Sequence, residues 1–198
     1  MSMIAVYSRL PEEAGEYLRQ IRTNRLPLSC TCDFSENGDF VRAVGTLLHS
    51  RRPLQRCGLV RDVTEAFCRG MEIPFPKLCF PLWERDFAYM TDSGRLSFSR
   101  WFLYRQDAER VVKVLIHELA HIAVKHHKDY IRVLRLELSL FADETLASVP
   151  KGITPVEYCG TFVSLAILEA LGESLGDPVF QKIRADESAK LNDFLHFI

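Results

Sequence analysis

Apolar residues recur every three or four positions along much of this chain, which is the spacing that gives a helix one buried face. The pattern predicts helices in the segments 12–25, 40–50, 60–71, 106–127, 130–149, 154–172 and from 177 onward. A capping box, Thr154-Pro155-Val156-Glu157, opens the segment 154–172. That segment is strongly apolar, so we expect its helix to be buried.

One segment follows a different period. In Leu96-Ser97-Phe98-Ser99-Arg100 apolar and polar residues alternate, as in a strand with one buried face. The turn residues Thr91-Asp92-Ser93-Gly94 separate residues 86–90 from residues 95–102, which predicts a short antiparallel hairpin. Prolines within 74–81 predict an extended connector between this sheet and the helices before it.

These elements predict an α+β fold that is mainly helical, with a small antiparallel sheet beside a central helix. We expect a helical N-terminal part at 1–73, a core at 74–150 and C-terminal helices at 151–198 that pack on the core. The chain has 198 residues, 47% of them hydrophobic, which is enough to bury one well-formed core. The amphipathic last helix is expected to pack on the body or on a second copy of the chain, giving a homo-oligomer.

The strongest chemical signal is the motif His117-Glu118-Leu119-Ala120-His121, inside the predicted helix 106–127. Residues four apart lie on the same face of a helix, so His117 and His121 can both bind one zinc ion. Glu118 then falls beside the metal, where it can act as general base toward a zinc-activated water. The motif predicts a zincin-like core and a zinc-dependent metallopeptidase that hydrolyses peptide bonds of a protein or peptide substrate.

A hydrolytic zinc needs a third protein ligand and an open fourth position. In the predicted helix 130–149, Glu137 and Glu144 share one face with apolar residues, while arginines occupy the other face. Since a buried carboxylate needs a metal or a hydrogen-bonded partner, one of the two is expected to be the third ligand. A turn centred near Lys128 favours Glu137, and a turn shifted later favours Glu144.

Downstream of the motif, His126-His127 is followed by Phe141-Ala142-Asp143-Glu144-Thr145-Leu146 and then by Val149-Pro150. Residues 96–150 in this respect resemble the ImmA/IrrE-type zinc metallopeptidases. The resemblance implies a gluzincin-like enzyme, with His117, His121 and either Glu137 or Glu144 on zinc and Glu118 as general base. It also implies a regulatory protein as the substrate.

The predicted hairpin has two interpretations. In zinc peptidases of this general shape such a strand lies along the cleft, where its free edge can pair with an extended substrate backbone. A core hairpin without a role in substrate binding is the alternative.

Charge and composition exclude several other classes of function. Lys plus Arg number 25 and Asp plus Glu number 26, so no overall field attracts nucleic acid or an anionic membrane. The sequence has neither an apolar run long enough for a membrane span nor a signal-peptide pattern, which predicts a cytoplasmic protein. The six cysteines lack the paired spacing of a structural zinc site and are expected to be reduced thiols.

Two other classes of function are compatible with the same residues. In the first, the protein binds zinc but is catalytically silent and acts as a regulatory interaction protein. In the second, it is a metal-free helical binding domain, with His117 and His121 as core histidines paired with Glu137 and Glu144. Stoichiometric zinc would exclude the second, and hydrolysis would exclude the first.

Overall fold

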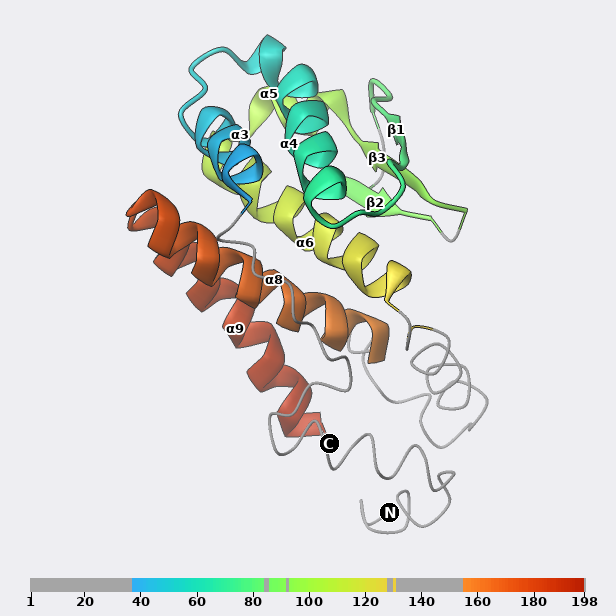
Figure 1. The fold of residues 1–198 in the computed structure, drawn as a ribbon, viewed down its shortest axis with the longest axis vertical. Coiled ribbons are helices and arrows are strands. Elements are labelled where there is room, and N and C mark those ends of the chain that lie inside the picture. Colours follow the sequence, from blue (N-terminus) through green and yellow to red (C-terminus); the bar gives the residue numbers. More distant parts are fainter. Residues whose placement is uncertain (1–36, 84–85, 92, 128–129, 131–154, 198) are drawn as a thin grey trace.

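The fold is mainly helical with one small sheet, as seen in the computed structural model, which describes residues 37–83, 86–91, 93–127, 130 and 155–197 (Figure 1). The helices are α3 (Gly38–Leu48), α4 (Arg56–Gly70), α5 (Arg100–Arg105), α6 (Ala108–His126), α8 (Pro155–Leu175) and α9 (Val179–Phe197). The strands are β1 (Lys77–Cys79), β2 (Ala88–Met90) and β3 (Arg95–Phe98). Two predicted segments lie outside the described residues: the helix at 12–25 and the range 131–149 of the helix predicted at 130–149. The second segment contains Glu137 and Glu144.

Helix α6 occupies the centre of the fold. In Figure 1, α3, α4 and the sheet lie on one side of it, and α8 and α9 lie on the other. Its first turn is capped by the Asp107 side chain, which accepts a hydrogen bond from the N–H of Arg110. Lys125 and His126 stand in its last turn, where cations interact favourably with the helix dipole. Buried residues of α6 belong to one continuous core with residues of α3, α4, the sheet, α5, α8 and α9.

The sheet is mixed, which corrects the expectation of a purely antiparallel sheet. β2 pairs antiparallel with β3, as the hairpin prediction requires, but β1 pairs parallel with the other edge of β3. The connector can pair because its prolines lie outside Lys77–Cys79 and leave backbone N–H groups available; that of Lys77 donates to the carbonyl of Gly94. β3 ends at Phe98, before the predicted limit at 102, because the Ser99 side chain caps α5.

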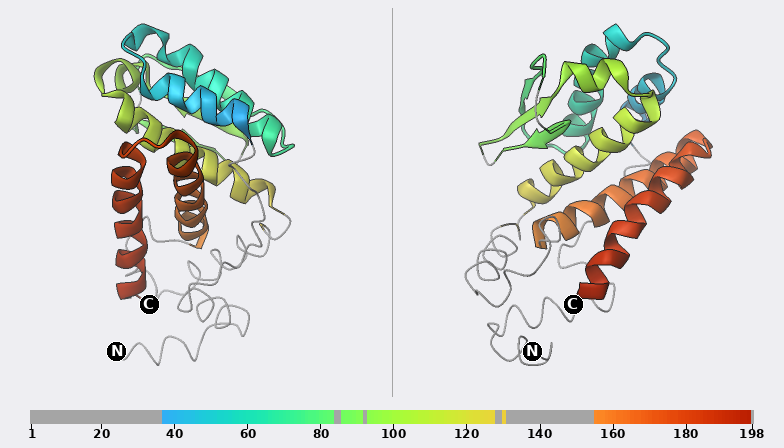
Figure 2. Two further views of the ribbon diagram at one scale, coloured as in Figure 1. Left: turned by 60° about the vertical axis from the view of Figure 1, so that its left-hand side comes forward. Right: turned by 180° about the vertical axis from the view of Figure 1, so that it is seen from behind.

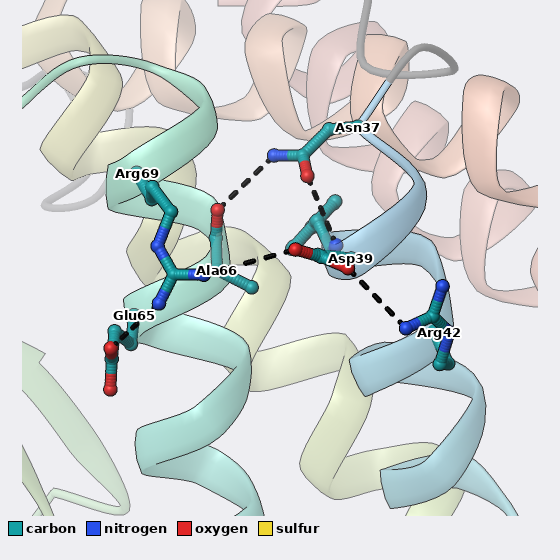
Figure 3. Close-up of polar contacts among 7 residues, drawn as sticks. Asn37, Asp39, Arg42, Glu65, Ala66 and Arg69 are labelled. Atoms are coloured by element: carbon teal, nitrogen blue, oxygen red, sulfur yellow. Dashed lines mark hydrogen bonds and ion pairs between the residues drawn. The ribbon is translucent and has the colours of Figure 1, made fainter.

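The first two described helices are joined by polar contacts that Figure 3 shows in close-up. The Asn37 side chain accepts a hydrogen bond from the N–H of Phe40, which caps α3, and donates one to the carbonyl of Ala66 in α4. Arg69 of α4 lies between Asp39 and Glu65, at 3.8 and 2.8 Å from their carboxylates. Asn37 therefore both starts one helix and fixes its position on the next.

The C-terminal helices α8 and α9 run side by side as a helical hairpin, as the two further views in Figure 2 show. α8 buries Cys159, Val163, Ile167, Leu168 and Leu171, so the prediction of a buried apolar helix is confirmed there. Among the helices that the structure describes, none has the length and apolar character needed to cross a membrane.

Candidate metal centre

Helix α6 carries the predicted motif residues on the side that faces α8 and β2. His117 and His121 are one turn apart, and their Nε2 atoms lie 3.2 Å from each other. The rings meet edge to face, with centroids 4.8 Å apart. Glu118 is 8% exposed. The motif thus has both histidine nitrogens pointing at one place, which is the arrangement predicted from their spacing.

A carboxylate from the first turn of α8 completes this group. Oε1 of Glu157 lies 3.2 Å from Nε2 of His117, and Oε2 lies 3.0 Å from Nε2 of His121. Ligand atoms held about 2.0–2.2 Å from a tetrahedral zinc are about 3.3–3.6 Å from one another. The observed separations of 3.0–3.2 Å are slightly shorter than this, and the three side chains form a group of potential metal ligands in the described part of the chain.

The carboxyl group of Glu157 is held ionised in the metal-free site. Burial raises the pKa of its carboxyl group, but hydrogen bonds and positive charge from His117 and His121 outweigh this effect and hold the pKa well below its ordinary value. The carboxylate is therefore ionised at neutral pH, as metal binding requires.

A glycine allows α8 to approach the histidines so closely. Gly160 lies one turn beyond Glu157, and a Cβ atom at this position would be 2.7 Å from Cε1 and 2.8 Å from Nδ1 of His121. Side-chain carbon atoms in ordinary contact are 3.4 Å or more apart. The absence of a side chain at residue 160 therefore permits the close approach of α6 and α8 at the site.

Two cavities open beside the histidines. The first, of about 310 Å³, is lined in part by Tyr89, Lys125, Tyr130 and Glu157, and the second, of about 380 Å³, in part by Phe87, Lys113 and Glu187. Both are lined by His117 and Glu118. Glu118 thus borders both cavities, where a water molecule and a substrate can enter.

Strand β2 borders both cavities. Met90 lines the first and Ala88 lines the second. The backbone of Phe87 and that of Thr91 bond to β3, so in an antiparallel pair the N–H and C=O groups of Ala88 and Met90 point away from it. Within the described sheet, β2 is an edge strand whose outward backbone groups lie next to the site.

The site residues predicted from the sequence are therefore partly accounted for. The structure brings His117, Glu118 and His121 to one cavity wall, as expected. Glu137 and Glu144 are outside the described residues, so their role as third ligand stays a prediction. Glu157 was missed because its place in a capping box already explained it; the signal was that it is the only charged residue in the apolar stretch 155–168.

Comparison of the chain with family models, with curated proteins and with solved structures finds no match. The resemblance to ImmA/IrrE-type metallopeptidases accordingly stays a prediction, and the function is argued from the site alone.

Proposed function

We propose that this protein is a zinc-dependent metallopeptidase. The observation that carries the proposal is the convergence of three side chains beside the buried Glu118: the Nε2 atoms of His117 and His121 lie 3.2 Å apart, and each lies 3.0–3.2 Å from one carboxylate oxygen of Glu157. Two histidines with one carboxylate form a known ligand set of catalytic zinc, which keeps its fourth position for water or substrate.

The chain's residues would divide the chemistry as follows. His117, His121 and Glu157 would hold a zinc ion, which would lower the pKa of a water molecule to near 7 and polarise a substrate carbonyl. Glu118 would take the proton that such a water gives up and pass it to the departing amine. The position of Glu118 suits this transfer, because it lines both cavities together with His117.

Strand β2 supports an extended peptide as the substrate. An incoming strand could bond to the outward backbone groups of Ala88 and Met90 and would then run from one cavity to the other, past His117 and Glu118. Backbone pairing of this kind holds a peptide bond at a fixed distance from the catalytic groups and leaves the substrate side chains to the cavities.

The ligand set is tested by zinc content after dialysis. We expect one zinc per chain in the wild type, and none in the variants His117→Ala, His121→Ala and Glu157→Ala. Glu137→Ala and Glu144→Ala are the matched comparisons, because each removes one of the carboxylates favoured by the sequence. If Glu137→Ala or Glu144→Ala loses zinc while Glu157→Ala retains it, the residue removed in that variant is the third ligand and Glu157 is not. A wild type that retains no zinc would refute the proposal.

Activity is tested with a diverse library of peptides and folded proteins, since the substrate sequence is not known. Mass spectrometry would identify new termini produced by the zinc-loaded wild type. Glu118→Gln is the control: it keeps the size of the side chain and should retain zinc but reduce hydrolysis by about 10²–10⁴-fold. Retained zinc with no cleavage of any library member would favour the alternative of a catalytically silent regulatory or interaction protein that binds metal.

A further inference from the structure

A carboxylate outside the proposed ligand set lies against one of the histidines. Glu187, from α9, places its Oε2 atom 3.3 Å from Nδ1 of His117. Its side chain is only 1% exposed, whereas glutamate is rarely buried to this extent unless it is paired. The contact joins the C-terminal helix to the centre of the candidate site.

The two nitrogens of His117 face different groups. Nε2 faces His121 and Glu157, so it is the nitrogen that would bind a metal through its lone pair. A neutral imidazole that gives one lone pair to a metal carries its proton on the other nitrogen. That nitrogen is Nδ1. The Glu187 carboxylate lies 3.3 Å from it, as an ion-pair contact rather than an aligned hydrogen bond, and a small turn of the ring would let the carboxylate accept the proton.

Two exposed ion pairs accompany this contact between α6 and α9. Lys182 lies 2.6 Å from Glu109, and Asp186 lies 2.8 Å from Lys113. Glu109, Lys113 and His117 follow one another at intervals of one turn on α6, so the third position of the series meets Glu187. The two helices thus meet through two exposed ion pairs and one buried contact.

We infer that Glu187 is a positioning residue for the metal centre: it accepts the Nδ1 proton of His117, fixes that ring with Nε2 toward the metal, and raises its affinity for zinc. The inference rests on the proposed metal site. Carboxylates in this position orient a metal-binding histidine and increase its basicity. The structure thereby gives α9, which supplies none of the proposed ligands, a part in building the site.

The test is zinc affinity, measured by competition with a chromophoric chelator, in Glu187→Gln. This substitution keeps the length of the side chain and removes its charge, and we expect affinity to fall by about 10–100-fold. Asp186→Asn is the matched control, because it removes a neighbouring carboxylate and an ion pair between α6 and α9 without touching His117. Its zinc affinity should stay within about twofold of the wild type.

Thermal melting of the metal-free proteins separates positioning from a structural role. A lowered melting temperature in Glu187→Gln with unchanged zinc affinity would overturn the inference. Nitrogen-15 NMR of the zinc-loaded wild type gives a second test that needs no variant: the proton of His117 should be on Nδ1, and a ring with zinc on Nδ1 would overturn the inference. A wild type that binds no zinc would instead refute the proposed function itself.

Discussion

Replacing Gly160 with alanine should weaken metal binding more than it weakens the fold. The new Cβ atom would be 2.7 Å from Cε1 of His121, which is about 0.7 Å closer than the 3.4 Å at which ordinary contact begins. The ring lines a cavity, so either it turns toward that cavity or the first turn of α8, including Glu157, moves away from the histidines. Either movement displaces a proposed ligand.

The magnitude follows from two opposing effects. Alanine is about 1 kcal/mol more favourable than glycine in a helix, while forcing an extra group into a packed contact costs about 1–3 kcal/mol. The free energy of unfolding of the metal-free protein should fall by about 0–2 kcal/mol. Metal–ligand distances tolerate only about 0.2 Å, so a displacement of several tenths of an ångström should weaken zinc binding tenfold or more.

The assay combines urea unfolding in a chelating buffer with zinc competition titration. Gly172→Ala is the matched control on the same helix, because its Cβ atom would meet Phe180 at 3.4 Å, an ordinary contact away from the histidines. We expect Gly172→Ala to bind zinc like the wild type. If Gly160→Ala also binds zinc with wild-type affinity, the close approach of α8 to His121 is not what holds the site together.

Three further predictions concern the rest of the fold. Asn37→Ala removes the cap of α3 and the hydrogen bond to Ala66. It should lower the free energy of unfolding by about 1–3 kcal/mol, as measured by urea titration. An unchanged urea midpoint of unfolding would contradict this. Burial raises the pKa of Cys68 from 9.0 to about 11. At pH 9 its alkylation, mapped by mass spectrometry, should therefore be much slower in the native than in the unfolded protein. The free energy of unfolding should also fall as pH rises from about 9 toward 11, because only the unfolded chain then loses the proton. Arg56→Met should cost about 2–4 kcal/mol, since the buried guanidinium donates to two backbone carbonyls at the end of α5; a loss below 1 kcal/mol would show that those carbonyls find other partners.

The helices were predictable because their signal is local. The period of apolar residues at 40–50 and 106–127 matches α3 and α6 to within two residues at each end. β1 was not predicted as a strand, since three residues are too few to show an alternation and its pairing with β3 depends on residues far along the chain. The strand pattern likewise could not show that Ser99 would end β3 by capping a helix.

The site was predictable only as far as it lies on one helix. His117, Glu118 and His121 are fixed relative to one another by helical geometry, which a sequence reveals directly. Glu157 and Glu187 reach the same place through the packing of α8 and α9, which no spacing rule gives. The sequence does contain a signal for Glu187. This residue follows Phe180 and Ile183 at helical intervals, so a charged residue lies on the apolar face of α9.

The proposed ligands come from two helices, and this has a consequence for local unfolding. A metal held by both α6 and α8 would have to be released before the C-terminal helical hairpin could swing away from the central helix. At a zinc concentration one hundred times its dissociation constant, that opening would become about 2.7 kcal/mol more costly, or about a hundredfold rarer. Amide hydrogens of α8 that exchange through this opening would be protected to the same degree, while those exposed by fraying at the ends of α3 would not. The supply of metal would thus regulate how long the hairpin stays closed and how readily a cellular protease reaches it.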